Sequence, residues 1–168
     1  YILAAVTGIF VLLADQFTKV YVSGHFEMAK SYEFLPGFLG ITYIHNDGGA
    51  WGMLGGYTWL LLSVTIVVML VCLALLLKYG VKDKLMFWAI ILVLSGGVGN
   101  MIDRIFRGGN VIDFLHFEFW PTFPVFNIAD CAVVVGACLL IFYFLKGLVD
   151  EQKQKRISIQ QAASENEQ

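Results

Sequence analysis

The chain has 168 residues and a net charge of −2; 58% of its residues are hydrophobic and only 14% are charged. Because a soluble domain usually has about 45–50% apolar and about 25% charged residues, this composition and a mean hydropathy of +0.74 argue against a soluble protein. No basic stripe is present, so nucleic acid is not an expected partner. The cysteines, Cys72, Cys131 and Cys138, lie in apolar runs without metal-ligand spacing, and we interpret them as packing residues.

Four segments are candidates for membrane spans, because a spanning helix needs about 20 mostly apolar residues. They comprise residues 1–22, 57–77, 85–104 and 123–145. The sequence therefore predicts an all-α membrane protein with four transmembrane helices. Residues 1–146 form a single domain in this prediction, and residues 147–168 form a polar cytoplasmic tail that we expect to be disordered after Asp150.

The first segment has no small-residue cleavage site, and it carries Asp15 and Lys19 near its end. We therefore interpret it as a transmembrane helix and not as a secretory signal peptide.

The connections between the segments differ in character. Residues 23–56 combine short β-branched pieces with Pro36 and several glycines, which predicts a small extracytoplasmic β-like cradle between the first two helices. Residues 105–122 are rich in aromatic side chains, which are typical of a membrane interface. Trp51 and Trp59 are expected at the same depth.

The distribution of Lys and Arg predicts the orientation in the membrane, because cytoplasmic loops carry an excess of these residues. One side holds Lys78, Lys82, Lys84, Lys146, Lys153, Lys155 and Arg156, and the other holds Lys19, Lys30, Arg104 and Arg107. Both termini are therefore predicted to be cytoplasmic.

With four helices and both ends inside, the first and third helices run outward and the fourth runs inward. Polar residues lie at the end of the first helix, at the end of the third and at the start of the fourth. These residues are Asp15, Gln16, Lys19, Asn100, Asp103, Arg104, Asn127 and Asp130. Helix count alone therefore predicts that the three groups meet at the outer face.

Charged residues at membrane depth cost about 2.5–3.5 kcal/mol each and are usually functional or paired. Asp130 is predicted about seven residues inside the fourth helix, roughly 10 Å deep, and Asp113 lies in the loop before that helix. Two carboxylates that share a site cannot both ionise cheaply, so one keeps a proton and one is a base. This pair would suit aspartic peptidase chemistry. Ser63 and Ser95 have no partner base, and the histidines lack metal spacing.

Structural readings of several polar residues remain open. Asp15 and Lys19 are four residues apart, so they either form a helix-stabilising pair or face a substrate. Asp103 is expected to pair with Arg107 in a structural role. The glycines of residues 96–99 are expected to pack helices closely and not to form a phosphate loop.

Two other classes of function are compatible with polar residues in a membrane. A proton-coupled transporter would use membrane acids as a relay, but inverted repeats and broken helices are not evident. A membrane scaffold would tolerate replacement of either aspartate by asparagine, whereas a peptidase would not.

Five blocks of the sequence resemble motifs of the lipoprotein signal peptidases, also called signal peptidase II. They are DQFTK at 15–19, NDGGAWG at 46–52, GGVGNMIDR at 96–104, VIDF at 111–114 and FNIAD at 126–130. The resemblance covers about residues 10–145. One departure is Trp51, where this family usually has Phe.

The resemblance implies that Asp113 and Asp130 are the catalytic pair. The positions that would support the pair or the substrate are Asn100, Arg104, Asn127, Asp15, Lys19 and Asn46, although Asn46 could instead only cap a turn. The implied substrate is a diacylglyceryl-modified bacterial prolipoprotein, cut just before its lipidated cysteine. The implied enzyme is a monomer among the lipids of the bacterial inner membrane, has its site near the outer face, and uses no metal or cofactor.

Overall fold

The computed structural model describes residues 1–49, 54–79 and 83–165, so the expectations for Trp51 and Lys82 lie outside the described residues. Four helices and three strands follow one another along the chain. Their bounds are α1 (Ile2–His25), β1 (Ser31–Leu35), β2 (Leu39–Asn46), α2 (Thr58–Tyr79), α3 (Lys84–Phe106), β3 (Val111–Phe117) and α4 (Ile128–Glu165). All four helices are long and apolar enough to cross a membrane, which confirms the predicted number of spans.

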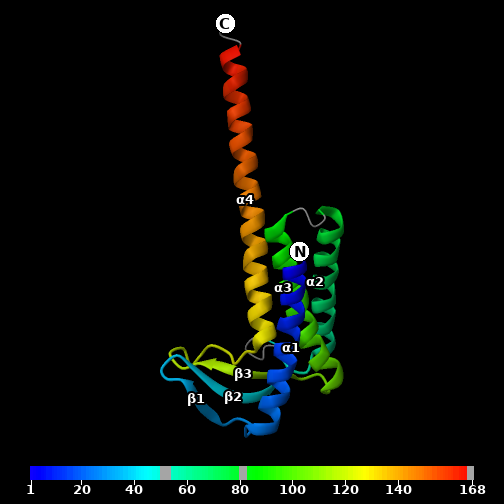
Figure 1. Cartoon of the computed structure of the whole chain (residues 1–168), viewed down its shortest axis with the longest axis vertical. Helices are drawn as coiled ribbons and strands as arrows, with labels where there is room; N and C mark the ends of the chain where they lie inside the picture. The colour runs from blue at the N-terminus through cyan, green and yellow to red at the C-terminus, as the bar shows by residue number, and fades with distance from the viewer. Residues whose placement is uncertain (50–53, 80–82, 166–168) are drawn as a thin grey trace.

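The helices form a bundle with α3 at its centre, and the sheet lies across one end of it (Figure 1). α3 packs against α1, α2 and α4. In the most apolar stretch of α3, 50% of the residues are buried inside the protein, whereas the corresponding fraction for α2 is 6%. Polar side chains near the end of α3 are therefore held between other elements, whereas α2 presents most of its surface to the bilayer.

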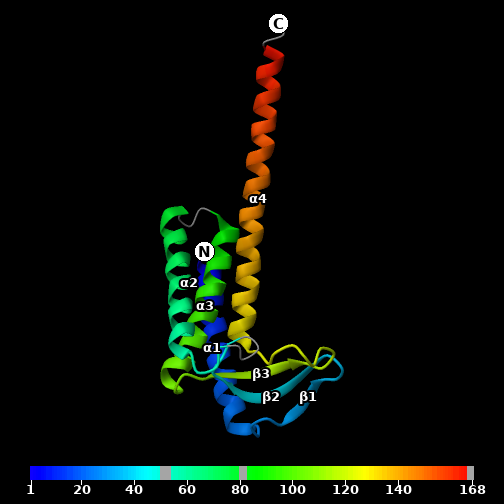
Figure 2. The ribbon, with the colours of Figure 1, turned by 180° about the vertical axis from the view of Figure 1, so that it is seen from behind.

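The strands form an antiparallel sheet in the order β1-β2-β3. Two of them come from the connection between α1 and α2, as predicted. The third, β3, comes from residues 105–122, where the prediction placed only a loop. The cradle is therefore built from two connections that are far apart in sequence, and Figure 2 shows the three strands side by side beneath the helices.

Two features fix β3 against the bundle. Gly108 and Gly109 have φ angles of 63° and 94°, a left-handed conformation that lets the chain turn sharply after α3. On the sheet, Tyr43 and Phe114 pack with Val22 of α1 in one buried apolar cluster. Asp113, next to Phe114, is thereby carried to the junction of sheet and helices.

α4 begins at Ile128, five residues later than predicted, because Phe126 is extended and pairs with β3. Its backbone N–H donates to the carbonyl of Leu115 at 2.8 Å. Pro124 also disfavours helical conformation in the residue before it. The predicted depth of Asp130 was therefore wrong, since Asp130 lies in the first turn of α4 and not seven residues inside it.

The expectation of disorder after Asp150 was also wrong, because α4 continues to Glu165. Residues 148–165 contain neither glycine nor proline and are rich in Glu, Gln, Lys, Arg and Ala, which have high helix propensity. Glu151 and Lys155 add an ion pair of 2.8 Å one turn apart. A helix of 38 residues is about 57 Å long, so nearly half of α4 projects beyond a hydrocarbon core of about 30 Å.

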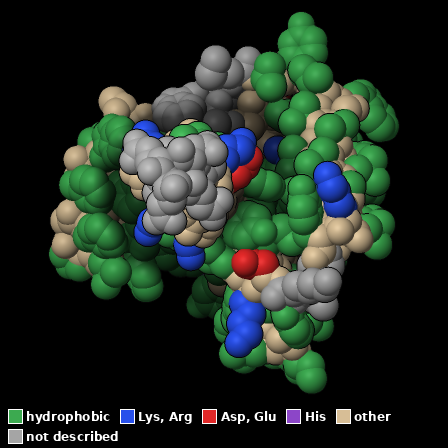
Figure 3. All heavy atoms as spheres, turned by 90° about the horizontal axis from the view of Figure 1, so that it is seen from above, with side chains coloured by type: hydrophobic (Ala, Val, Ile, Leu, Met, Phe, Trp, Pro, Cys, Tyr) green, Lys and Arg blue, Asp and Glu red, His purple; other side chains and the backbone are tan. Residues whose placement is uncertain are grey.

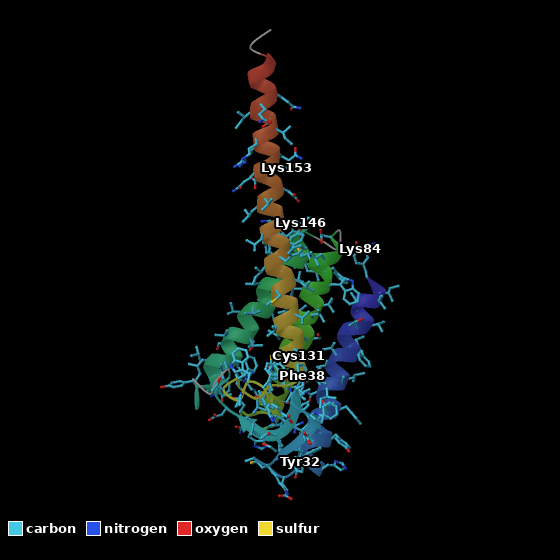
Figure 4. The ribbon with its side chains drawn as sticks, turned by 90° about the vertical axis from the view of Figure 1, so that its left-hand side faces the viewer. Tyr32, Phe38, Lys84, Cys131, Lys146 and Lys153 are labelled. Carbon is cyan, nitrogen blue, oxygen red and sulfur yellow. The ribbon has the colours of Figure 1, made fainter. Side chains whose placement is uncertain are left out.

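The N-terminus and the last turns of α4 lie on the side of the bundle away from the sheet (Figure 1). Figure 4 places Lys84 and Lys146 at this end of the bundle, Lys153 farther along α4, and Tyr32 at the opposite end in the sheet. Viewed from the side of the termini, Lys and Arg side chains lie on the face toward the viewer while hydrophobic side chains cover the periphery (Figure 3).

Candidate active site

A cavity of about 290 Å³ lies where β3, the end of α3 and the start of α4 meet. Its polar lining consists of Asn46, Asn100, Arg104, Asp113 and Asp130, and its apolar lining includes Phe123, Val133 and Val134. The structure therefore brings five of the eight predicted site residues to one cavity. Asn127, a sixth, is fully buried behind the two aspartates.

Asp113 lies on β3 and is almost completely buried. Its Oδ1 accepts a hydrogen bond from Asn127 Nδ2 at 2.6 Å, and its Oδ2 accepts one from Asn46 Nδ2 at 2.7 Å. Burial, followed by the negative charge of Asp130, raises the pKa of Asp113 to about 7. The two amide hydrogen bonds act in the opposite direction by stabilising the carboxylate.

An irregularity in β2 places Asn46 on the same face of the sheet as Asp113. Ile41 pairs with Leu115 but Ile44 pairs with Asp113, so β2 has one residue more than β3 between these pairs. Because side chains alternate between faces, this extra residue puts Ile44 and then Asn46 on the Asp113 face. The sequence motif contained Asn46, but only the register of the sheet decides where its side chain lies.

Asn127 and Asp130 form a reciprocal cap at the start of α4. Asn127 is the N-cap residue, and its Oδ1 accepts a hydrogen bond from the Asp130 backbone N–H at 2.9 Å. Asp130 Oδ2 in turn accepts a hydrogen bond from the Asn127 backbone N–H at 3.1 Å. This is the geometry of a capping box, and it fixes the rotamer of Asp130 as a consequence of starting the helix.

Asn100 of α3 holds the other oxygen of Asp130, since its Nδ2 donates to Asp130 Oδ1 at 2.7 Å. Asn100 Oδ1 accepts hydrogen bonds from Asn127 Nδ2 at 3.1 Å and from Lys19 Nζ at 3.0 Å. The two asparagines therefore connect Asp113 and Asp130 through side-chain amides.

Asp15 and Lys19 are both fully buried and form the predicted ion pair, with Lys19 Nζ 2.9 Å from Asp15 Oδ2. Neither is among the described residues that line the cavity. Asp15 Oδ1 also accepts a hydrogen bond from the Ala129 backbone N–H at 2.9 Å, which fastens α1 to the first turn of α4. The contacts of Asp15 thus connect α1 to the start of α4 outside the cavity.

Two of the α3 glycines, Gly96 and Gly99, pack closely, as predicted. A Cβ on Gly99 would lie 2.7 Å from Asp15 Oδ2 and 3.2 Å from Ala129 Cβ. Gly99 thus allows α1 and α4 to approach α3 at the level of the site.

Asp103 pairs with Arg107 at 3.2 Å, as predicted, but it also contacts Lys19 at 3.1 Å. Its Oδ2 accepts a hydrogen bond from the Ile112 backbone N–H at 3.1 Å, which ties β3 to α3. Gln16, for which no role was predicted, donates through Nε2 to the carbonyl of Gly99 at 3.1 Å. The one-turn spacing of Asp103 from Asn100 was the available signal that both lie on one helical face.

Arg104 lines the cavity, and its Nε is buried without a hydrogen-bond partner among the described residues. A buried donor of this kind is costly when it is left unpaired. Arg104 is therefore a lining residue of the cavity with an unused donor among the described residues. No cluster of three or more potential metal ligands occurs among the residues described.

Comparison with known proteins gives a consistent result. Residues 7–146 match the family described as signal peptidase (SPase) II. A lipoprotein signal peptidase of Bacillus pumilus is 41% identical over 156 residues, covering 92% of this chain and 96% of that protein. One of Syntrophus aciditrophicus is 41% identical over 160 residues, with the same coverage.

Two solved structures, both described as bacterial membrane enzymes, have a similar fold. The first has a TM-score of 0.82 and 33% identity, and covers 88% of this chain and 90% of its own. The second has a TM-score of 0.77 and 34% identity, and covers 85% and 92%.

Proposed function

Because the chain belongs to the signal peptidase II family, we propose that Asp113 and Asp130 are its catalytic pair. The chain is a multi-pass membrane peptidase that removes signal peptides from prolipoproteins. The observation that supports the proposed pair is that both carboxylates line one cavity while side-chain amides hold each of them.

The proposed reaction needs one proton on the pair. The ionised carboxylate takes a proton from water, whose oxygen attacks the carbonyl carbon of the scissile peptide. The protonated carboxyl donates its proton to the departing nitrogen as the C–N bond breaks. The pKa of about 7 for Asp113 supports a shared proton near neutral pH, and the pair titrates as a unit.

The supporting residues have separate roles in this proposal. Asn46, Asn100 and Asn127 hold the carboxylates through amide donors. Arg104 donates to a carbonyl of the substrate peptide, because its guanidinium offers several donors and its Nε has no partner in the free protein.

We propose that the substrate is a prolipoprotein with a diacylglyceryl group on the cysteine that follows the cleaved bond. Val133 and Val134 line the cavity from α4, and Val134 is 60% exposed on this apolar helix. Acyl chains leave a bilayer only at high cost, so the lipidated cysteine enters sideways along α4.

The proposed orientation has both termini and the tail (147–168) in the cytoplasm and the cradle and site at the outer face. Lys84 and Lys146 lie at the end opposite the sheet (Figure 4), where the positive-inside rule places the cytoplasm. Residues 1–146 form the proposed peptidase domain. They supply all the described residues of the site, so the enzyme acts as a monomer in this proposal.

The test is a gel-shift cleavage assay with the full chain in detergent. Wild type is expected to cut a diacylglyceryl-modified prolipoprotein and to leave the unlipidated form uncut. Asp113→Asn and Asp130→Asn are each expected to lose activity by at least about 10³-fold while still folding, which thermal unfolding checks. Asp150→Asn, on the exposed part of α4, is the matched control and should cut normally. Full activity in either site variant would exclude that aspartate from the chemistry.

A further inference from the structure

The ammonium group of Lys19 donates a hydrogen bond to Asn100, and Asn100 in turn donates to Asp130 of the proposed catalytic pair. The ammonium has three polar partners, which are Asp15 Oδ2 at 2.9 Å, Asp103 Oδ2 at 3.1 Å and Asn100 Oδ1 at 3.0 Å. An ammonium has three donors, so these partners use all of them. Lys19 is fully buried and is not among the described residues that line the cavity.

The contact with Asn100 decides which end of that amide faces Asp130. A side-chain amide has one end that accepts and one that donates, and its two orientations have nearly the same shape. Because an ammonium only donates, it requires Oδ1 of Asn100 on its own side. Nδ2 is then left to donate to Asp130 Oδ1 at 2.7 Å.

The opposite orientation of Asn100 would produce two repulsive contacts. Its Nδ2 would face the Lys19 ammonium, which is donor against donor, and its Oδ1 would face the Asp130 carboxylate, which is acceptor against acceptor. Asn127 reinforces the observed orientation, since its Nδ2 donates to Asn100 Oδ1 at 3.1 Å and to Asp113 Oδ1 at 2.6 Å. The orientation of one amide therefore affects both aspartates.

The charge of Lys19 is balanced locally. Asp15 and Asp103 contact it directly, and Arg107 pairs with Asp103 at 3.2 Å. Two positive and two negative groups thus form one cluster. The charge of Lys19 also lowers the pKa of Asp113 through space, whereas the hydrogen bond to Asn100 is its direct contact with a residue that holds the pair.

We propose that Lys19 is a positioning residue, which fixes the amide orientation of Asn100 and through it the geometry of the Asp113–Asp130 pair. This inference rests on the proposed function, because it assigns Lys19 an effect on the catalytic step. A residue that served only to join α1 to α3 would not act through Asn100.

The test is a double-mutant cycle of Lys19→Met and Asn100→Ala, measured as kcat and KM for the lipidated substrate. Lys19→Met is expected to lower kcat about 10- to 100-fold, as loss of a charge-assisted hydrogen bond implies, and to leave KM within about twofold. The double variant should be no slower than Asn100→Ala alone, because the effect of Lys19 passes through Asn100. Multiplying effects, or a change in KM alone, would overturn the proposal.

Lys19→Met removes the ammonium partner of the buried carboxylates of Asp15 and Asp103, which favours unfolding. A second variant therefore tests the proposal with less loss of stability. Asp15→Asn/Lys19→Met removes one charge of each sign and keeps an Oδ1 that can accept from Ala129. It should fold and show the same loss of kcat. If neither variant folds, Lys19 is architectural and the proposal fails. Lys30→Met, which removes an exposed lysine paired with Glu27, is the matched control and should have wild-type kcat.

The outcomes also separate this inference from the proposed function. An inactive, well-folded wild type, or an active Asp113→Asn variant, would contradict the peptidase assignment of the pair. An active wild type with independent effects of Lys19 and Asn100 would contradict only the positioning role.

Discussion

Asn46 and Asn127 hold the two oxygens of Asp113, and each comes from a different element. Their amides donate hydrogen bonds, so they stabilise the ionised carboxylate against burial and the charge of Asp130, which raise the pKa of Asp113 to about 7. The proton affinity of Asp113 is thus a balance that one residue change should shift in a known direction.

We expect Asn46→Ala to shift the basic limb of the pH–rate profile to higher pH. The proposed reaction is lost as pH rises through the pKa of the protonated carboxyl. Removing a donor to the carboxylate raises that pKa, by roughly half to one unit for a hydrogen bond worth about 1 kcal/mol. Measurement of kcat between about pH 5 and pH 9 tests this. Asn110→Ala, in the turn before β3, is the control, and a downward shift or none would contradict the assignment.

At the scale of elements, the residues that begin α4 are also residues of the site. Asn127 caps the helix through its Oδ1 and holds Asp113 through its Nδ2. Ala129, in the same turn, donates its backbone N–H to Asp15. The first turn of α4 therefore connects this helix to α1 and to β3. The two functions of Asn127 use different atoms of its side chain.

Two substitutions of Asn127 should separate these functions. Ser at this position keeps an oxygen that can cap the helix but has no donor that reaches Asp113, so Asn127→Ser should lose most of its activity. Asn127→Ala removes the cap as well, so it should also lose activity and be about 1 kcal/mol less stable than Asn127→Ser. Thermal unfolding in detergent and the cleavage assay are the two measurements. Equal stability of the two variants would show that the cap contributes little, and full activity in Asn127→Ser would show that Asp113 does not need this amide.

At the scale of the whole molecule, α4 extends well beyond the bundle on the side of the termini (Figure 1). Its side chains from residue 147 to residue 161 are exposed, and the site lies at the other end of the bundle. The extension contributes no described residue to the cavity around Asp113 and Asp130.

Deletion of residues 150–168 should therefore leave kcat, KM and melting temperature close to those of the full chain. The deletion keeps Lys146, which lies at the end of the bundle away from the sheet (Figure 4). Cleavage of the lipidated substrate and thermal unfolding, compared with the full chain in the same detergent, are the measurements. A tenfold loss of activity in a folded, truncated protein would show that the tail takes part in substrate processing.

Much of this protein was predictable from the sequence, because a bilayer imposes strong constraints. Backbone groups in hydrocarbon must be paired within a helix, so apolar runs of sufficient length identify the four helices. Helix count then places the polar ends of α1, α3 and α4 together, and the motifs select Asp113 and Asp130 as the proposed pair. The ion pairs of Asp15 with Lys19 and of Asp103 with Arg107 followed from spacing along one helix.

The tertiary structure alone decided the features that depend on contacts between distant segments. Residues 111–117 are a strand because β2 offers them hydrogen bonds, and an extra residue in β2 turns Asn46 toward Asp113. α4 begins at Ile128 because Phe126 pairs with β3 and Asn127 caps the helix. Strand pairing and amide orientation are properties of two segments at once, so neither segment's sequence determines them, whereas a transmembrane helix satisfies its backbone within itself.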